Sequence, residues 1–271
     1  MLTSCPSLPP ALDTDCALFL DVDGTLVGFA GHPEHVRIPP CLVESIATIS
    51  QRLHGALALV SGRPLTQLDQ LFAPLQLPAA GLHGAQLRRN GNDTAPLQQT
   101  ADWLHDLRQH ALQFAHAHPG VLIEHKGQAL ALHWRNAPDA EAQVLAFAHA
   151  QLPQLPGVRL QPGNRVIEFL PAGHDKGAAI QALMQAAPFA GRRPVFIGDD
   201  LTDEDGFVVV DQLGGHGVLV GQRDGSHARY ALADVAAVHH WLREAATAGS
   251  RTPHPTPCME TSGADNAAIE S

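Results

Sequence analysis

Two carboxylates follow a short apolar run near the start of the chain, in the segment Asp21-Val22-Asp23-Gly24-Thr25-Leu26. The run itself, residues 17–22, is typical of a strand buried on both faces of a parallel sheet. Ligands of open parallel sheets bind beyond the carboxyl ends of the strands, and Asp21 and Asp23 would lie there. Burying two unpaired carboxylates is costly, and a bound cation removes that cost, so the pattern indicates a cation site. A turn built from Asp and Gly is the alternative.

A hydroxyl and a lysine occupy places where a phosphate group could be bound. Ser61-Gly62-Arg63 closes a second apolar run, residues 56–60, and offers a hydroxyl with backbone N–H groups at the start of a helix. Lys176 stands at the start of a helix expected over residues 177–187, where its ammonium could neutralise a phosphoryl group. Without the other segments, an ordinary surface lysine would explain Lys176 as well as a phosphate-binding lysine does.

A second acidic group ends another expected strand. Asp199 and Asp200 follow the apolar residues 195–197, and Asp203 and Glu204 open the helix after them. Carboxylates in a first helical turn are often only partners of the helix dipole, which is sufficient to explain Glu204. That explanation does not apply to Asp199 and Asp200, because they stand at a strand end.

Short apolar runs alternate with helical patterns over most of the chain. The expected strands cover residues 17–22, 56–60, 194–197 and 218–220, and the expected helices cover residues 39–53, 65–73 and 177–187. This alternation predicts a parallel sheet with helices on both faces. The segments that bear the chemistry would lie at its strand ends.

The middle of the chain has a different pattern. Helices are expected over residues 102–118 and 140–151, and strands over residues 121–125, 129–134 and 165–170. Paired helices with adjacent antiparallel strands make an α+β unit, inserted between two halves of the parallel-sheet domain.

The four segments that bear the chemistry resemble the motifs of the haloacid-dehalogenase superfamily of phosphohydrolases: DxDGT, a Ser or Thr, a Lys and GDD, in that order. The resemblance implies an α/β fold, with a Rossmann-like parallel-sheet core and an inserted α+β cap domain. We expect the core in residues 15–97 and 172–246, the cap in residues 98–171, and flexible termini in residues 1–14 and 247–271.

Roles for the site residues follow from this resemblance. Asp21 would be the nucleophile, attacking phosphorus in line and forming an aspartyl-phosphate. Asp23 would protonate the leaving oxygen and later activate the hydrolytic water, and crowding by Asp21 and Asp199 would favour its protonated form. Ser61 and Lys176 would bind oxygens of the transferring phosphoryl group.

The resemblance also implies Mg²⁺, a hard cation that prefers oxygen ligands. Its protein ligands would be Asp21, the backbone carbonyl of Asp23, and Asp199. Asp200 and Asp203 would hold waters or orient the neighbouring groups. A cation at this place would offset the repulsion between the nucleophile and a phosphate dianion.

Further segments resemble trehalose-6-phosphate phosphatases, and they extend the resemblance over about residues 15–245. They are Gly81-Leu82-His83-Gly84-Ala85, Glu124-His125-Lys126-Gly127, Ala131-Leu132-His133-Trp134-Arg135 and Arg165-Val166-Ile167-Glu168. That family acts in the last step of trehalose biosynthesis, so the resemblance implies trehalose 6-phosphate as the substrate. The charged residues Glu124, Lys126, Arg135 and Glu168 would lie on neighbouring strands, with Glu124 and Lys126 on one face. Such a platform suits a hydroxyl-rich disaccharide; a solvated face of exposed ion pairs is the alternative.

Three more residues are expected at the substrate. Arg63 and His83 would face the seam between the cap and the core. Asn164 stands where some members of the family carry a basic residue, so its contact with the sugar departs from the family pattern.

The composition limits partners and location. The 271 residues include 17 Lys and Arg against 27 Asp and Glu, a formal net charge of −10, which disfavours a nucleic-acid partner. No apolar run approaches the roughly 18–20 residues that cross a bilayer. Widely spaced cysteines and the lack of a secretory pattern at the N-terminus favour a cytoplasmic location. We expect a monomer, with a trehalose-6-phosphate synthase as its pathway partner.

Three alternatives stay open. The nearest is a capped phosphatase for another sugar phosphate, such as sucrose 6-phosphate or a hexose phosphate. A signalling receiver domain also combines an acceptor Asp, an acidic pair, a hydroxyl and a Lys around Mg²⁺, but it needs neither Asp23 nor an inserted cap. A catalytically silent sugar-sensing module would not require the acid at position 23 either.

Overall fold

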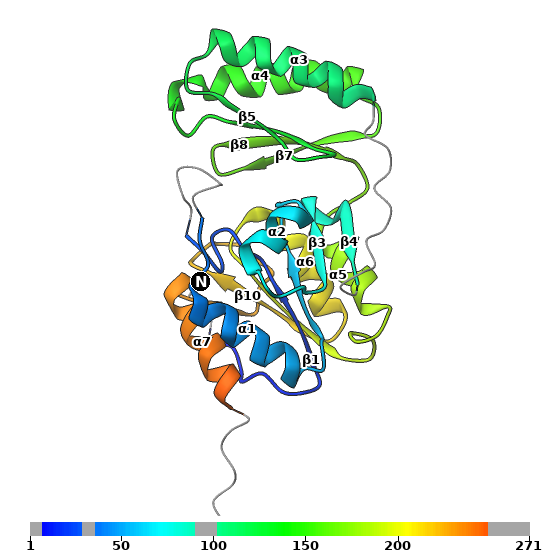
Figure 1. The fold of residues 1–271 in the computed structure, drawn as a ribbon, viewed down its shortest axis with the longest axis vertical. Coiled ribbons are helices and arrows are strands. Elements are labelled where there is room, and N and C mark those ends of the chain that lie inside the picture. The colour runs from blue at the N-terminus through cyan, green and yellow to red at the C-terminus, as the bar shows by residue number, and fades with distance from the viewer. Residues whose placement is uncertain (1–6, 29–35, 90–101, 249–271) are drawn as a thin grey trace, which may run out of the picture.

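Two β-sheets organise the part of the chain that the computed structural model describes, residues 7–28, 36–89 and 102–248 (Figure 1). The larger sheet has the strand order β11-β10-β9-β1-β2-β3-β4. Its strands are β1 (Cys16–Leu20), β2 (Leu57–Val60), β3 (Ala79–Gly81), β4 (Gln86–Arg88), β9 (Arg193–Gly198), β10 (His216–Val220) and β11 (Tyr230–Leu232). All neighbouring pairs are parallel except β3 and β4. Every residue of β1 and β2 is buried, which explains why both read as continuous apolar runs.

Helices cover both faces of this core sheet (Figure 1). Helices α1 (Pro40–Arg52) and α7 (Val235–Thr247) pack together on one face, and α5 (Lys176–Met184) and α6 (Glu204–Gln212) pack together on the other. Helix α2 (Leu65–Phe72) follows β2 and contacts β3. Aromatic rings fill the layer under α5 and α6: Phe19 of β1 stacks on Phe189, and Phe196 of β9 meets Phe207 of α6, each pair with ring centroids 5.4 Å apart.

The second sheet and its two helices form what we call the cap unit. Its strands are antiparallel in the order β5-β6-β8-β7, with β5 (Leu122–His125), β6 (Leu130–His133), β7 (Val158–Gly163) and β8 (Val166–Pro171). Helices α3 (Asp102–Ala117) and α4 (Glu141–Gln151) lie on the face away from the core sheet (Figure 1). Leu132, Ile167 and Phe169 belong to the apolar cluster beneath them. The opposite face of the cap sheet is turned toward the core.

Short 3-10 turns connect these elements, and two of them bear on the site. These are η2 (Leu82–Gly84), which follows β3, and η5 (Leu201–Asp203), which leads into α6. Two others, η3 (Pro138–Ala140) and η4 (Leu152–Gln154), flank α4.

The expected fold class is confirmed: a mostly parallel sheet with helices on both faces, and an antiparallel α+β unit that comes from the middle of the chain. The domain limits stay predictions, and the one near residue 98 lies outside the described residues, as do 1–6 and 249–271 of the termini. In the remainder of those termini, Leu12 is buried and α7 continues to Thr247. Within the described residues, no helix is long and apolar enough to cross a membrane.

Candidate active site

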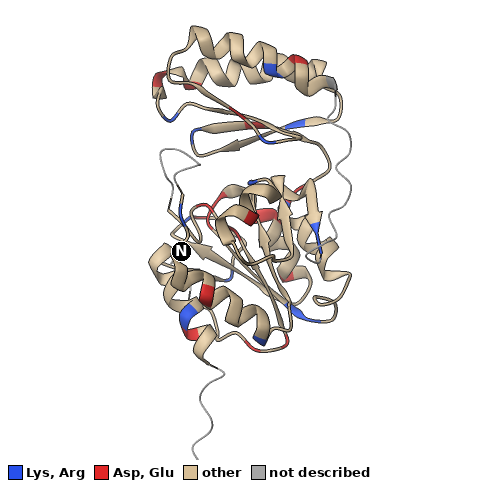
Figure 2. Ribbon diagram, viewed as in Figure 1, with Lys and Arg blue, Asp and Glu red and all other residues tan. Residues whose placement is uncertain are grey.

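Three adjacent strands of the core sheet end at the same edge, so the residues that directly follow these strands lie close together. Asp21 comes directly after β1, Ser61 after β2 and Asp199 after β9, and β1 lies between the other two strands. The N–H of Asp21 donates to the carbonyl of Ile197 at 3.0 Å, which continues the ladder past the end of β1. The edge faces the cap unit, and charged residues lie on both sides of the seam (Figure 2).

A pocket occupies this seam, and twelve of the fourteen residues expected at the site line it. They are Asp21, Asp23, Ser61, Arg63, His83, Glu124, Lys126, Arg135, Asn164, Glu168, Lys176 and Asp200. The remaining two, Asp199 and Asp203, lie beside Asp21 in an acidic cluster. The structure therefore brings the expected residues to one place, while their individual roles stay predictions.

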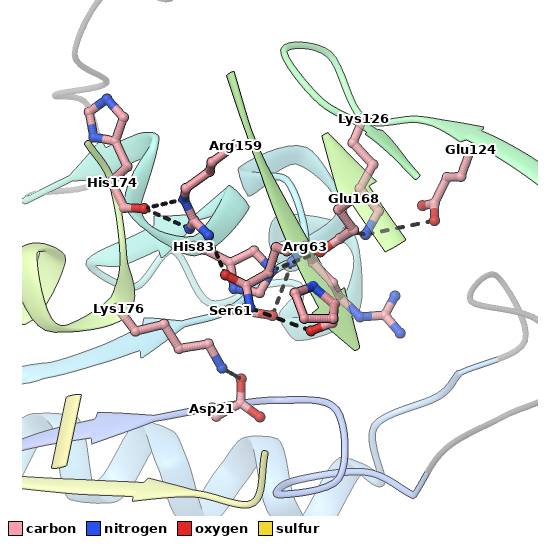
Figure 3. A network of polar contacts seen from close by, with 12 residues as sticks. Asp21, Ser61, Arg63, His83, Glu124, Lys126, Arg159, Glu168, His174 and Lys176 are labelled. Carbon is pink, nitrogen blue, oxygen red and sulfur yellow. Dashed lines mark hydrogen bonds and ion pairs between the residues drawn. The ribbon is translucent and has the colours of Figure 1, made fainter. Parts of the chain in front are cut away.

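Lys176 joins two of the carboxylates. Its Nζ donates to Asp21 Oδ1 at 2.8 Å (Figure 3) and to Asp203 Oδ1 at 2.6 Å. All three side chains are almost wholly buried. Burial lowers the pKa of Lys176, but the charges of Asp203 and Asp21 outweigh it and raise the pKa above its ordinary value. Burial also raises the pKa of Asp21 well above its usual range, against the pull of Lys176. Lys176 is thus a buried cation and not a surface lysine.

Asp203 orients the loop between β9 and α6. Its second oxygen, Oδ2, accepts from the backbone N–H groups of Asp199 at 2.9 Å and Asp200 at 2.8 Å. Asp200 caps η5 in return, accepting from the N–H of Leu201 at 2.6 Å. Because both oxygens of Asp203 are engaged within the chain, its contacts suit an orienting role better than direct binding of a ligand.

The acidic cluster has the donor set of a hard cation. Carboxylate oxygens of Asp21, Asp199 and Asp203 lie within 4.8 Å of one another, and Lys176 supplies one positive charge against these three acids. Burial and the charge of Asp203 raise the pKa of Asp199 to about 7. A divalent cation with oxygen ligands would balance the excess negative charge, so the residues present fit Mg²⁺.

The backbone conformation and the narrow space at position 24 explain why the DxDGT segment has a glycine there. Its φ of +88° lies in the left-handed region, and a Cβ at this position would come within 2.1 Å of Asp199 Oδ2. The close approach lets Thr25 Oγ1 donate to Asp199 Oδ1 at 3.2 Å. The turn after β1 therefore reaches across to the end of β9.

Asp23 has a partner that the sequence interpretation did not include. Its two oxygens accept from Nε and Nη2 of Arg63, each at 2.6 Å, in a bidentate ion pair. The sequence predicts only that Asp21 and Asp199 crowd Asp23. The structure adds the guanidinium of Arg63, which lies against its carboxylate. Arg63 itself is nearly buried, and its N–H donates to Ser61 Oγ at 3.2 Å.

Charged groups of the cap unit reach the seam from its inward face. Glu124 of β5 and Glu168 of β8 are both in register with Ala131 of the intervening β6, so they lie on the same face. Glu168 accepts from Lys126 Nζ at 2.5 Å and pairs with His83 Nε2 of the core at 2.8 Å (Figure 3). Burial opposes ionisation of Glu168, but the charge of Lys126 and the contact with His83 hold its pKa well below the ordinary value.

Glu124 is held in the same way. Its carboxylate pairs with His133 Nε2 at 2.9 Å and accepts from Gln67 Nε2 at 3.2 Å. Against the effect of burial, the contact with His133 and the charge of Lys126 lower its pKa to about 2. This inward face is therefore not a solvated surface of exposed ion pairs, but a network largely closed off between the two units.

Lys126 and Arg135 do not lie on strands, where the charged platform would place them; their positions agree instead with the expected strand limits, residues 121–125 and 129–134, which leave Lys126 in a turn. Lys126 lies just past β5, in the turn where its N–H donates to the carbonyl of Ala129 at 2.9 Å, and Arg135 lies past the end of β6. Arg135 Nη2 donates to the backbone carbonyl of Asn164 at 3.3 Å, in the turn between β7 and β8. Both basic residues still reach the pocket because the turns carry them there.

Several residues around the site were not found from the sequence. Gln67 and His133 both contact Glu124. Nothing in its spacing marks Gln67, whereas His133 stands in the segment of residues 131–135 that resembles the family and was given no role there. Arg223 follows the end of β10 and donates to the carbonyl of Asp199 at 2.8 Å, and its place after a strand was the available signal. Glu204 pairs with Arg223 and also accepts from the N–H of His227 at 2.8 Å, which goes beyond a dipole partner.

Known proteins share both the sequence and the fold. The family model described as trehalose-phosphatase matches residues 19–237. A trehalose-6-phosphate phosphatase of Escherichia coli (strain K12) is 41% identical over 240 residues, covering 88% of this chain and 90% of that protein. A probable trehalose-phosphate phosphatase of Sinorhizobium fredii is 43% identical over 215 residues, covering 78% and 81%. The C-terminal domain of the C. albicans trehalose-6-phosphate phosphatase superposes with a TM-score of 0.72 at 20% identity, over 89% of this chain and 98% of that one, which shows the common fold.

Proposed function

The chain belongs to the trehalose-phosphatase family, and we propose that it hydrolyses α,α-trehalose 6-phosphate to trehalose and inorganic phosphate through an aspartyl-phosphate on Asp21. The observation that supports this most strongly is the two-sided pocket. On the core side it carries Asp21, Ser61 and Lys176, and on the cap side Glu124 and Glu168. One end suits a phosphoryl group and the other a hydroxyl-rich sugar.

Asp21 attacks phosphorus in the first step of the proposed reaction. Lys176 engages Oδ1, which leaves Oδ2 as the nucleophile. A bond forms between this oxygen and phosphorus while the bond from phosphorus to the sugar O6 breaks, and Asp23 supplies the proton that the leaving oxygen takes up. Lys176 and the Ser61 hydroxyl then contact the phosphoryl oxygens and stabilise the charge that develops on them.

Mg²⁺, held by Asp21, Asp199 and the carbonyl of Asp23, would neutralise charge on the phosphate and so lower its repulsion from the nucleophile. Lys176 and Asp203 keep the carboxylates of this cluster in place, and Asp203 does so through the N–H groups of Asp199 and Asp200.

Hydrolysis of the aspartyl-phosphate returns Asp21. Asp23, now a carboxylate, takes a proton from the attacking water, and the bond between phosphorus and the Asp21 oxygen breaks. Each oxygen of Asp23 accepts one N–H of Arg63 and keeps a second lone pair, which is available for proton transfer while the ion pair holds the carboxyl group in place. The cap unit above the pocket keeps bulk water from the intermediate.

The cap unit supplies the contacts to the sugar. Glu124, Lys126 and Glu168 present carboxylate acceptors and an ammonium donor to its hydroxyls, with Arg135 and Asn164 at the turns beside them. Binding energy from the sugar ring far from phosphorus favours the closed arrangement of cap and core. A monomeric state, a cytoplasmic location and a trehalose-6-phosphate synthase as the source of substrate stay predictions.

A panel of phosphate esters tests this function. Phosphate release would be measured with trehalose 6-phosphate, sucrose 6-phosphate and glucose 6-phosphate at equal concentration in the presence of Mg²⁺. We expect the highest kcat/KM with trehalose 6-phosphate. Activity confined to the monosaccharide, or higher on sucrose 6-phosphate, would show that the cap reads a different sugar.

A further inference from the structure

Gln67 lies where the core and the cap meet, and it touches charged groups of both. It is the third residue of α2, half-buried, and lines the pocket. Its Nε2 donates to Glu124 Oε1 of the cap at 3.2 Å. Its Oε1 accepts from Arg63 Nη1 at 3.4 Å, and Arg63 holds Asp23. One side chain thus connects Glu124 with the Arg63–Asp23 pair. Glu124 and Arg63 are both labelled in Figure 3.

The two partners of Gln67 demand an amide. Glu124 is ionised, with a pKa of about 2, so it can only accept a hydrogen bond. The guanidinium of Arg63 can only donate. A carboxylate at position 67 would repel Glu124, an ammonium would repel Arg63, and an apolar side chain would serve neither. Only a side chain with a donor and an acceptor on one head group joins them.

We propose that Gln67 is a positioning residue that fastens Glu124 of the cap to the Arg63–Asp23 pair of the core. Under the function proposed above, on which this inference rests, Glu124 contacts the sugar and Asp23 serves the leaving oxygen. Closure of the cap on a sugar and correct placement of Asp23 then occur together. An ester without a sugar gains less from this connection, because it leaves the cap contacts unused.

Two isosteric variants separate the two hydrogen bonds. Gln67→Met removes both, and Gln67→Glu keeps the acceptor for Arg63 but faces Glu124 with a like charge. Both hydrogen bonds have a charged partner, so we expect kcat/KM for trehalose 6-phosphate to fall at least about tenfold in Gln67→Met, and further in Gln67→Glu. Part of the loss should appear in kcat, because Asp23 acts in the chemical steps. With p-nitrophenyl phosphate, which carries no sugar and whose leaving group needs no proton, only the hydrolytic step uses Asp23, so the loss should be at least about threefold smaller than with trehalose 6-phosphate.

Gln70 gives a matched control on the same helix. It is exposed, one turn further along α2, and Gln70→Met and Gln70→Glu should stay within about twofold of the parent with both substrates. A double-mutant cycle then tests the contact with Glu124 itself. In a Glu124→Gln background the new amide can donate to a carboxylate at position 67, so adding Gln67→Glu should cost less than about threefold.

Three results would overturn the proposal. The kcat/KM values of the Gln67 variants could equal those of the Gln70 controls, or the losses could be equal with both substrates. The loss caused by Gln67→Glu could also be the same with and without Glu124→Gln. A parent protein that hydrolyses p-nitrophenyl phosphate but not trehalose 6-phosphate would instead remove the proposed function. These results are distinguishable because the substrate comparison in the parent comes before any variant.

Discussion

Replacing Lys176 by Met tests whether a single buried cation holds the acidic cluster together. Its Nζ lies 2.8 Å from Asp21 and 2.6 Å from Asp203, and the three side chains are 3%, 5% and 0% exposed. Coulomb's law at an effective dielectric constant of about 20 gives each contact about 6 kcal/mol, most of which desolvation offsets. Removing one partner of a buried pair leaves uncompensated charge, so the variant should lose about 3–5 kcal/mol of unfolding free energy.

The assay is urea unfolding at neutral pH with a chelator present, compared with an exposed pair of similar length. Arg229 Nη2 and Asp211 Oδ1 are also 2.6 Å apart, but both side chains are more than half exposed, so Arg229→Met should cost less than about 1 kcal/mol. Adding Mg²⁺ should recover part of the stability lost in Lys176→Met, because a divalent cation can replace the missing positive charge. Equal costs for the two variants would refute the view that burial makes Lys176 indispensable to Asp21 and Asp203.

Three other predictions concern the cap, its pH dependence and the turn after β1. Glu168→Ala should lower kcat/KM for trehalose 6-phosphate by about 10- to 100-fold, with a much smaller loss on p-nitrophenyl phosphate; equal losses would mean that the cap does not read the sugar. Because the pKa of Glu124 is lowered from 4.5 to about 2, its carboxylate adds stability above about pH 4.5 that is lost as the pH falls toward 2. The difference in unfolding free energy between the parent and Glu124→Gln should therefore shrink from pH 5 toward pH 3, by up to about 3 kcal/mol in the limit, and a constant difference would contradict the assignment. Gly24→Ala should cost more than about 1 kcal/mol and abolish most turnover, since its Cβ would displace Asp199; a fully active variant would show that this turn is not required.

Elements with a strong apolar pattern could be predicted from the sequence, and very short or interrupted ones could not. Strands β1, β2 and β9 are largely buried runs, and Asp21, Ser61 and Asp199 follow their ends, where the sequence predicts them. The three-residue strands β3 and β4 are too short for a period to be visible. Strand β7 contains Pro162 and Gly163, which weaken a strand pattern; it forms at an edge of the sheet, where a proline is tolerated.

The contacts across the seam depend on how the two units face each other, which no local pattern contains. Glu124 and Glu168 could be singled out because they resemble family positions on predicted strands. The joint between Gln67 and Glu124 spans 57 residues of sequence, and the pair of Arg63 with Asp23 spans 40. Glutamine and arginine are common near the starts of helices, so only the folded structure shows what Gln67 and Arg63 contact.

Phosphate release from trehalose 6-phosphate by the parent and by Asp21→Asn, each with Mg²⁺ and after chelation, tests the central claim most directly. Asn has the shape of Asp but lacks the charged nucleophile, and Lys176 can still be accommodated beside its carbonyl oxygen. We predict rapid release by the parent with Mg²⁺, loss of release on chelation, and no release above background by a folded Asp21→Asn variant. Full activity of Asp21→Asn would contradict the assignment of Asp21 as the nucleophile and with it the mechanism proposed for this site.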